Sequence, residues 1–349
     1  MPLIDVHSSI DALTLQPRTG LGMPCFVVKM PDTSGTGGPA APTYKEFRTL
    51  KQFKDDPDMA DLQTNDVLLG KLETIFDQDN RHEKFAILKT EDIKTGLDQF
   101  KDNEFFFILS ADEVTENKLA IAQYANSAQN KRLRIAILQE KTVALGKAYN
   151  LLKNVVCLYS PVDGEYFDAA ITANVGSLQV GSVTWKFKEV RGVTTQYLSE
   201  ETMLEIDDAR MIAYAYKHGS SQTTEGWSSY ITADDIIPQY IDDLMGAAWV
   251  RYDVEKRMAK SLKVNPKLPY DNRGIKVLEG DATTTLLEAS NMGIVGQDDD
   301  GVFVYRVQAL PRDSQTPEDI VTRKYRGISY AYRKSGAIHE VWVSGTVEF

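Results

Sequence analysis

Acidic side chains and histidines in this chain could in principle bind a metal ion, but their spacing argues against it. Asp298, Asp299 and Asp300 stand directly before Gly301. The spacing of a calcium-binding loop and its terminal glutamate are both absent, so we expect a solvated turn here. No two histidines have the close helical spacing of a zinc site. The four histidines are His7, His82, His218 and His339.

Catalytic and phosphate-binding motifs are also missing from the sequence. No Gly-x-Ser-x-Gly run provides a nucleophile. The run from Gly35 to Gly38 lacks the lysine and hydroxyl residue of a phosphate loop, and we interpret it as a flexible loop. The acidic pairs Asp234-Asp235 and Asp242-Asp243 fall at the start of a predicted long helix, where they would complement its dipole. We therefore expect no enzyme activity, no metal and no cofactor.

The composition limits the class of protein. Among 349 residues, 39 Lys and Arg face 50 Asp and Glu, for a formal charge of −11. This balance argues against direct nucleic-acid binding, which needs a basic surface. Cys25 and Cys157 lie in apolar runs and are expected to be buried thiols. We see no signal peptide and no apolar run near the roughly 20 residues that cross a membrane, so we expect synthesis in a reducing cytosol.

Two basic clusters remain without an assigned role. One lies at the end of the predicted long helix, and the other lies on a short helix near the C-terminus. Each is either a solvated face that suits a helix C-terminus or a docking surface for an acidic partner. The first cluster contains Arg251, Lys256, Arg257, Lys260 and Lys263, and the second contains Arg323, Lys324 and Arg326.

The first half of the chain alternates between helices and short apolar strands. This alternation predicts an open, mostly parallel sheet covered by helices on both faces, an α/β arrangement within an overall α+β chain. The predicted strands are 24–30, 85–88, 105–109, 133–138 and 155–159, and the predicted helices are about 64–78, 91–101, 115–129, 142–152 and 163–174.

The pattern changes after Gly176. Strands are expected at 183–190, 211–216, 227–232 and 302–309. A long amphipathic helix should run from about 235 to 262 with Pro238 in its first turn, and a second helix from about 274 to 292. Thr316 and Pro317 are typical of a helix start, and this short helix should end near Arg326.

Both ends of the chain have strand-like patterns. Near the N-terminus, Ile4, Val6 and Ile10 share one face of an extended arm. Near the C-terminus, residues 328–332 and a final strand are expected to form a β-hairpin. An apolar terminal strand either packs within its own domain or is donated to a neighbouring chain, and the sequence leaves both open. The apolar residues of the C-terminal arm are Ile338, Val341, Val343, Val347 and Phe349.

These changes of pattern predict four parts of the chain. They are an N-terminal arm (1–20), an alternating α/β region (21–175), a C-terminal core domain (176–335) and a C-terminal strand arm (336–349).

Residues 181–349 resemble the sheath subunit of contractile phage tails. The resemblance rests on structural stretches of moderate specificity, and it covers about half of the chain well. The matching stretches are 181–188, 191–194, 227–232, the helix with Ile241, Asp242, Trp249 and Val250, then 268–275 and the ending 335–347.

The resemblance implies a structural role. Sheath subunits of this family stack as hexameric rings around an inner tube, exchange terminal strands with their neighbours, and contract to drive the tube through a cell envelope. By this resemblance Arg323, Lys324 and Arg326 would face the tube, with the basic end of the long helix as second choice. Expected partners are other copies, the tube protein, and baseplate and terminator proteins, in a virion tail assembled in the host cytoplasm. The alternatives are another phage tail or baseplate protein, or an enzyme on an open α/β sheet.

Overall fold

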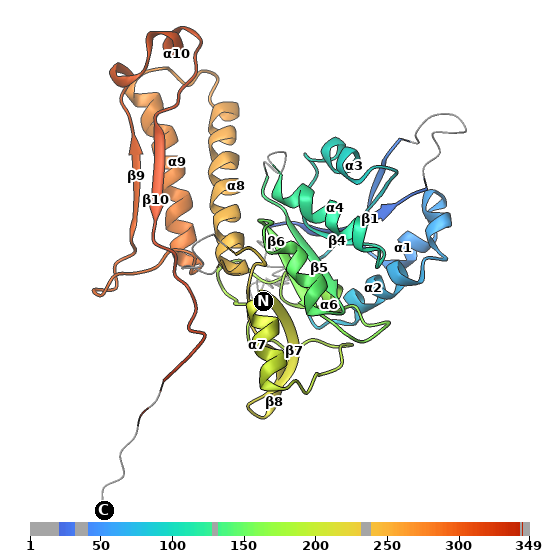
Figure 1. The fold of residues 1–349 in the computed structure, drawn as a ribbon. Helices are drawn as coiled ribbons and strands as arrows, with labels where there is room; N and C mark the ends of the chain where they lie inside the picture. Colours follow the sequence, from blue (N-terminus) through green and yellow to red (C-terminus); the bar gives the residue numbers. More distant parts are fainter. Residues whose placement is uncertain (1–20, 32–40, 128–131, 232–238, 343, 345–349) are drawn as a thin grey trace, which may run out of the picture.

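The computed structural model describes residues 21–31, 41–127, 132–231, 239–342 and 344. Its centre is an eight-stranded open sheet in the order β2-β3-β1-β4-β5-β6-β7-β8 (Figure 1). The inner strands are parallel, and β2 and β8 run antiparallel at the edges. The strands are β1 (Met23–Lys29), β2 (Thr43–Phe47), β3 (Phe85–Thr90), β4 (Phe105–Ser110), β5 (Ile135–Glu140), β6 (Val155–Tyr159), β7 (Met211–Lys217) and β8 (Ser220–Thr223).

Helices cover both faces of this sheet, as the alternating pattern predicts. Successive side chains of a strand point to opposite faces, so Phe26 packs in one apolar layer and Cys25 in the other. The first layer includes residues of α1, α2 and α6, and the second includes residues of α3, α4 and α7. The helices are α1 (Leu50–Lys54), α2 (Asp66–Asp77), α3 (Ile93–Gln99), α4 (Thr115–Asn126), α5 (Val143–Gly146), α6 (Phe167–Asn174) and α7 (Glu200–Asp208).

Polar side chains fix where several of these helices begin. The side chain of Asn65 accepts a hydrogen bond from the backbone N–H of Leu68, and Asp92 accepts one from Thr95. Both satisfy donors that the first turn of a helix leaves free. Cys25 and Cys157 are free and buried, as expected, and burial raises the pKa of both thiols. The strands β7 and β8 join the same sheet, so the sheet continues beyond residue 175.

Beside the sheet stands a second lobe, formed by residues 241–332 (Figure 1). In it α8 (Ile241–Val264) and α9 (Asn272–Asn291) lie side by side, and a two-stranded sheet packs on α9. That sheet contains β9 (Tyr305–Ala309) and β10 (Ile328–Tyr332), and α10 (Pro317–Val321) lies at the far end of the lobe. Short 3-10 helices span Pro57–Leu62, Lys147–Tyr149 and Arg312–Ser314.

The strand predicted over 183–190 is wrong. Trp185 and Lys186 are both buried, whereas alternation would bury only one of them. Phe187 has a left-handed backbone (φ 62°), which interrupts an extended chain. The hydroxyl of Thr223 donates to the Trp185 carbonyl and accepts from the Lys188 N–H, and backbone bonds join Phe187 and Lys188 to the same residue without forming a regular strand.

The strand predicted over 227–232 is also absent from its described residues. The backbone N–H groups of Ser228, Ser229 and Ile231 donate to Gln239, Val155 and Asn150 respectively, which lie in three separate segments. No regular ladder can form from such scattered acceptors.

Three boundaries differ from the expectation. The long helix begins at Ile241, after the extended residue Tyr240, so its first turn does not include Pro238. α10 ends at Val321, because Arg323 adopts a left-handed conformation (φ 56°) that closes the helix. β9 begins at Tyr305, because Val302 still belongs to a turn in which Asp298 accepts its N–H.

The predicted C-terminal hairpin is wrong in its pairing. β10 pairs with β9, in register from Ile328 opposite Ala309 to Tyr332 opposite Tyr305. The part of the C-terminal arm that the structure describes, 336–342 and 344, contains no strand. The predicted N-terminal strand lies outside the described residues.

Candidate functional site

The C-terminal arm leaves the body of the molecule as an extended segment (Figure 1). Its large apolar side chains are exposed: Ile338 is 80% exposed, Val341 75% and Trp342 93%. Apolar side chains gathered on a surface in this way are typical of an interaction site. The other apolar residues singled out for the arms, Ile4, Val6, Ile10, Val343, Val347 and Phe349, lie outside the described residues.

One residue of this arm, His339, is packed onto the body. Its side chain is only 10% exposed, and its Nε2 lies 3.0 Å from the hydroxyl oxygen of Thr184. Its Nδ1 lies 3.3 Å from a carboxylate oxygen of Glu225, and its ring meets the Tyr240 ring edge-on at 4.7 Å. His339 therefore fixes the described part of the arm to the body, while Ile338, Val341 and Trp342 around it remain exposed.

The carboxylate that holds His339 is itself partly buried. Burial raises the pKa of Glu225, and its ion pair with Lys186 opposes that shift. The sequence analysis did not find this anchor. The available signal was a lone histidine within an apolar alternating segment, which does not reveal partners that lie about a hundred residues or more away in the sequence.

The small sheet of β9 and β10 offers a place where a strand could be added. Among the described residues, no strand pairs with the outer edge of either β9 or β10. Tyr305, Val307 and Tyr332 fix one face of this sheet by packing against the core. An edge of unpaired backbone groups on a fixed sheet can bind an extended segment of another chain.

The basic residues near the C-terminus occupy the tip of the lobe. Arg323, Lys324 and Arg326 are exposed and follow α10, so they do not lie on a helix as expected. Arg326 pairs with Asp319 at 3.3 Å, and the Tyr270 hydroxyl donates to the carbonyl of Lys324. This turn is thus fixed to the lobe and presents its cations outward.

The basic end of α8 is divided between paired and free cations. Arg251 pairs with Glu255, and Arg257 pairs with Asp253 and Glu288. In contrast, Lys256, Lys260 and Lys263 are exposed and have no acidic partner among the described residues.

The carboxyl ends of the parallel strands, where open α/β sheets usually bind ligands, hold a buried ion pair. The Lys71 ammonium lies 2.6 Å from the Asp168 carboxylate and 3.0 Å from the carbonyl oxygen of Ser110. Burial lowers the pKa of Lys71, but Asp168 and Glu113 outweigh it, and the pKa ends above its usual value. The pair therefore occupies this position as a fully bonded structural element.

The same network continues across the sheet. Glu113 joins Lys71 at 3.3 Å to Lys118 at 2.8 Å, and Lys118 lies 3.6 Å from Glu140. The hydroxyl of Tyr149 donates to Glu140 at 2.7 Å. Charges alternate in sign along this row, which ties helices from both faces to the sheet.

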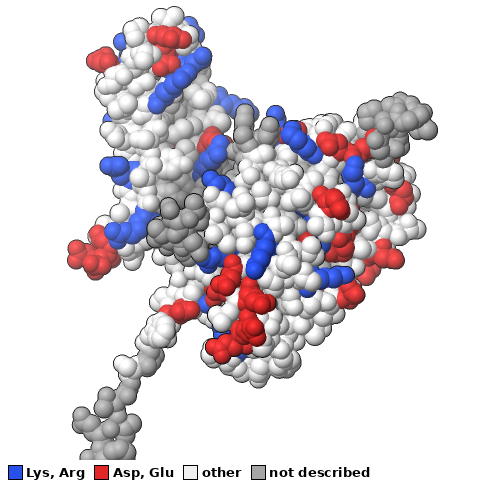
Figure 2. Space-filling model, viewed as in Figure 1, with Lys and Arg blue, Asp and Glu red and all other residues white. Residues whose placement is uncertain are grey.

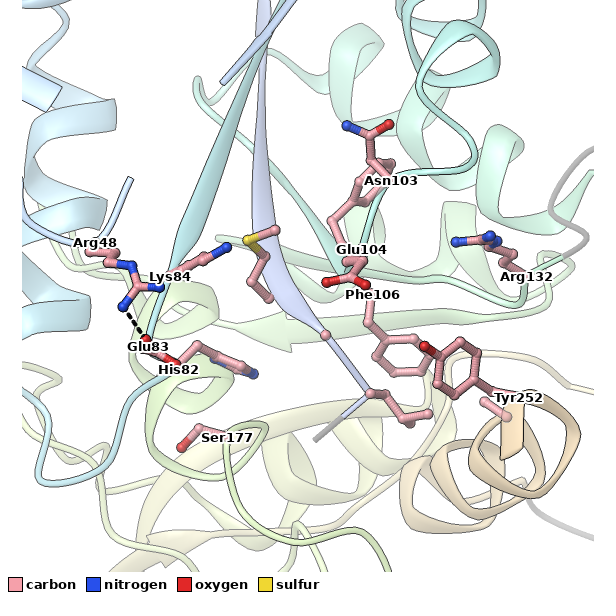
Figure 3. A pocket seen from close by; sticks show the side chains of 15 residues that line it. Arg48, His82, Glu83, Lys84, Asn103, Glu104, Phe106, Arg132, Ser177 and Tyr252 are labelled. Atoms are coloured by element: carbon pink, nitrogen blue, oxygen red, sulfur yellow. Dashed lines mark hydrogen bonds and ion pairs between the residues drawn. The ribbon is translucent and has the colours of Figure 1, made fainter. Parts of the chain in front are cut away.

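A cavity of about 440 Å³ lies at the opposite, amino end of the strands (Figure 3). Arg48 and Glu83 form an ion pair on one side of it, and Phe106 and Tyr252 lie together on the other. Ser177 and His82 also line this cavity.

The described residues contain no group of three His, Cys, Asp or Glu side chains that could hold a metal ion. The turn at Asp298 is closed by its own carboxylate, which accepts from the N–H groups of Asp300 and Val302. Within the same residues, every helix is too short or too polar to cross a membrane.

Known structures share this fold over nearly the whole chain. No protein-family model matches the sequence, and no curated protein matches it. A sheath chain of an extracellular contractile injection system (PVC) in its contracted state matches with a TM-score of 0.70 and 11% identity, over 100% of this chain and 98% of the other. The contracted helical sheath of the anti-feeding prophage matches at 0.64 and 12%, over 99% and 100%.

A crystal structure of a sheath tail protein from Listeria innocua matches with a TM-score of 0.56 and 8% identity, over 90% of this chain and 95% of the other. The likeness covers the sheet, the lobe and their order along the chain. The chain has the fold of contractile tail sheath subunits.

Proposed function

We propose that this chain is a structural subunit of a contractile tail sheath. Copies would stack as hexameric rings around an inner tube, and contraction of the stack would drive the tube through a target envelope. The observation that carries the proposal is the sheath fold itself, which extends over the whole chain rather than over one domain. On this proposal the protein assembles in the bacterial host cytoplasm and works as part of a virion tail.

The arms would connect neighbouring subunits by strand addition. The exposed Ile338, Val341 and Trp342 support a donated C-terminal strand, since burial in a neighbour would remove their apolar surface from water. The open edges of β9 and β10 support a receiving site on each subunit. The donated segments would include Ile4, Val6 and Ile10 at one end and Val343, Val347 and Phe349 at the other.

Arg323, Lys324 and Arg326 would face the tube. Their support is the position of this turn, which follows α10 at the tip of the lobe (Figure 1), and the presence of three exposed cations within four residues. An acidic surface on the tube would attract them at long range and fix the ring's orientation. Baseplate and terminator proteins would close the two ends of the sheath.

Electron microscopy of the protein expressed alone tests the proposed function. Hollow, helically striated tubes would support a sheath subunit whose arms suffice for polymerisation. If only small particles form at every concentration and salt, including after co-expression with the tube protein, the proposal is wrong.

A truncation that removes Ala337 to Phe349 tests strand donation separately. We expect a folded monomer that no longer forms tubes, because the donated strand is lost while the core is intact. Tubes formed by the truncated chain would show that the C-terminal arm does not connect subunits. Circular dichroism and thermal unfolding check that the body still folds.

A further inference from the structure

Three lysines form a regular row on one face of α8. Lys256, Lys260 and Lys263 are spaced by four and three residues, which places them on one face of the helix. All three are exposed and have no acidic partner among the described residues, although their neighbours Arg251 and Arg257 are paired. Tyr252, one turn earlier, is 46% exposed and lies beneath the ammonium of Lys256. We call Lys256, Lys260 and Lys263 the basic row.

A row of the same spacing and the opposite charge lies on α7. Glu201, Glu205 and Asp208 are also spaced by four and three residues, and all are exposed. Leu204, on the same face, is 60% exposed. No Lys or Arg occurs within α7, and these three carboxylates have no cation partner among the described residues. We call Glu201, Glu205 and Asp208 the acidic row.

The two rows cannot meet within one subunit. The indole N–H of Trp227 donates to Asp207 at the end of α7, and the same ring stacks on Tyr240, which precedes α8. α7 therefore lies beside the first turn of α8, whose 24 residues extend roughly 36 Å. The basic row occupies the last three turns of that helix. Figure 2 shows acidic side chains gathered at the α7 end of the molecule.

We propose that the basic row of one subunit docks against the acidic row of a second copy of this chain. The equal spacing lets two helices lie side by side with each lysine next to a carboxylate. Complementary charges of this kind fix the register of a contact and speed its formation.

The contact is head-to-tail, because different surfaces of the two copies meet. Such contacts generate rings or helical filaments, whereas contacts between identical surfaces end at a dimer. The contact would be one of those holding the proposed sheath together, and to that extent it rests on the proposed function. It differs from strand donation, because neither row belongs to the arms.

Charge reversal tests the contact in the full-length chain. One variant carries Lys256→Glu, Lys260→Glu and Lys263→Glu, and the second carries Glu201→Lys, Glu205→Lys and Asp208→Lys. A third variant combines all six changes. A control carries three reversals at exposed lysines outside both rows and without an ion pair among the described residues: Lys51→Glu, Lys101→Glu and Lys147→Glu.

Sedimentation velocity at low salt measures self-association, and it does not require tubes to form. Each single-row variant should need about tenfold or more higher concentration to associate than the unaltered chain, because three attractions become repulsions. An equimolar mixture of the two single-row variants should associate again, and so should the variant that carries all six substitutions. The control should behave like the unaltered chain. Added salt should weaken every association that depends on the rows.

Two outcomes would overturn the contact. In one, the single-row variants associate as readily as the control. In the other, both single-row variants lose self-association, but neither their mixture nor the variant with all six substitutions recovers it. That result would mean that the two rows do not face each other. Either result leaves the proposed function intact if the unaltered chain still forms striated tubes. If the unaltered chain itself forms no tubes, the result counts against the proposed sheath function rather than against the contact between the two rows.

Discussion

The ion pair of Lys71 and Asp168 illustrates how a single residue can decide the stability of this fold. Both side chains are almost fully buried, at 0% and 1% exposed. Removing one member leaves the other as an unpaired buried charge, so Asp168→Ala should lower the free energy of unfolding by about 3–5 kcal/mol. Urea unfolding followed by circular dichroism measures the change. The pair of Lys141 with Asp163 is a matched exposed control, and Asp163→Ala should leave stability unchanged.

Equal effects of the two substitutions would contradict this account. They would mean that the Lys71 ammonium finds another partner or reaches water when Asp168 is lost. Glu113, which already lies 3.3 Å from Lys71, is the nearest candidate for that role.

Glu113 gives the network a defined dependence on pH. Burial alone would raise its pKa, but Lys71 and Lys118 hold it below the usual 4.5. Stability from this carboxylate is therefore complete above the unfolded pKa and is lost as the pH falls through the lower folded pKa. Glu113→Gln should be less stable than the unaltered chain at pH 7, and the difference should narrow as the pH falls below 4.5 and close below the lowered folded pKa.

Urea unfolding of both proteins at a series of pH values checks this sign. A difference that stays constant down to pH 3, or that grows as the pH falls, would show that the ion pairs do not set the pKa of Glu113. Glu116→Gln, an exposed change in the first turn of α4, should leave the pH profile unchanged.

At the scale of elements, His339 holds the described part of the C-terminal arm on the body. His339→Ala removes the contacts with Thr184, Glu225 and Tyr240. We expect trypsin to cut at Lys334 several times faster in the variant, because cleavage follows the population of the open segment. The unfolding temperature should not change, since the arm adds little to the core.

Ile338→Ala is the control for this experiment, because Ile338 is 80% exposed and makes no comparable contact. Its cleavage rate should match that of the unaltered chain. If His339→Ala also leaves the rate unchanged, the histidine does not hold the arm, and the direction of the arm is set elsewhere.

The elements that could be predicted from sequence are those whose burial follows a simple period. β3, β4, β5 and β6 are short apolar runs between helices, and the sequence predicts each to within two residues. The segment around Trp185 and Phe187 could not be predicted, because two adjacent buried side chains and one left-handed residue break any period. α10 ends early for a related reason, the left-handed Arg323.

The interaction surfaces were harder to predict than the elements. The exposed apolar arm and the basic clusters could be listed from residue types. The pairing of β10 with β9 and the contact of His339 with Glu225 depend on distant segments that composition does not bring together. A resemblance over residues 181–349 carried the prediction of fold class for the second half, where periodicity was weakest.

At the scale of the whole molecule, the lobe sets how far the basic tip stands from the sheet. α8 and α9 pack along each other and hold the turn of Arg323 and Lys324 at the far end (Figure 1). A lobe built in this way would let its tip bind a tube while the sheet contacts neighbouring subunits. The two functions can then be separated by substitution.

Arg323→Glu with Lys324→Glu should therefore abolish binding to the inner tube without preventing polymerisation. Both side chains are exposed, so the body should remain folded. Co-sedimentation with the tube protein measures binding, and electron microscopy of the variant alone measures polymerisation. Lys101→Glu with Lys147→Glu changes the net charge equally at exposed sites outside the lobe, and should bind the tube normally. If both double variants lose the tube equally, net charge rather than the tip governs docking. If neither double variant loses binding to the tube, the tube contact lies elsewhere. Reversing the charge of a cationic turn that faced an acidic tube surface would replace attraction by repulsion, so binding could not be retained.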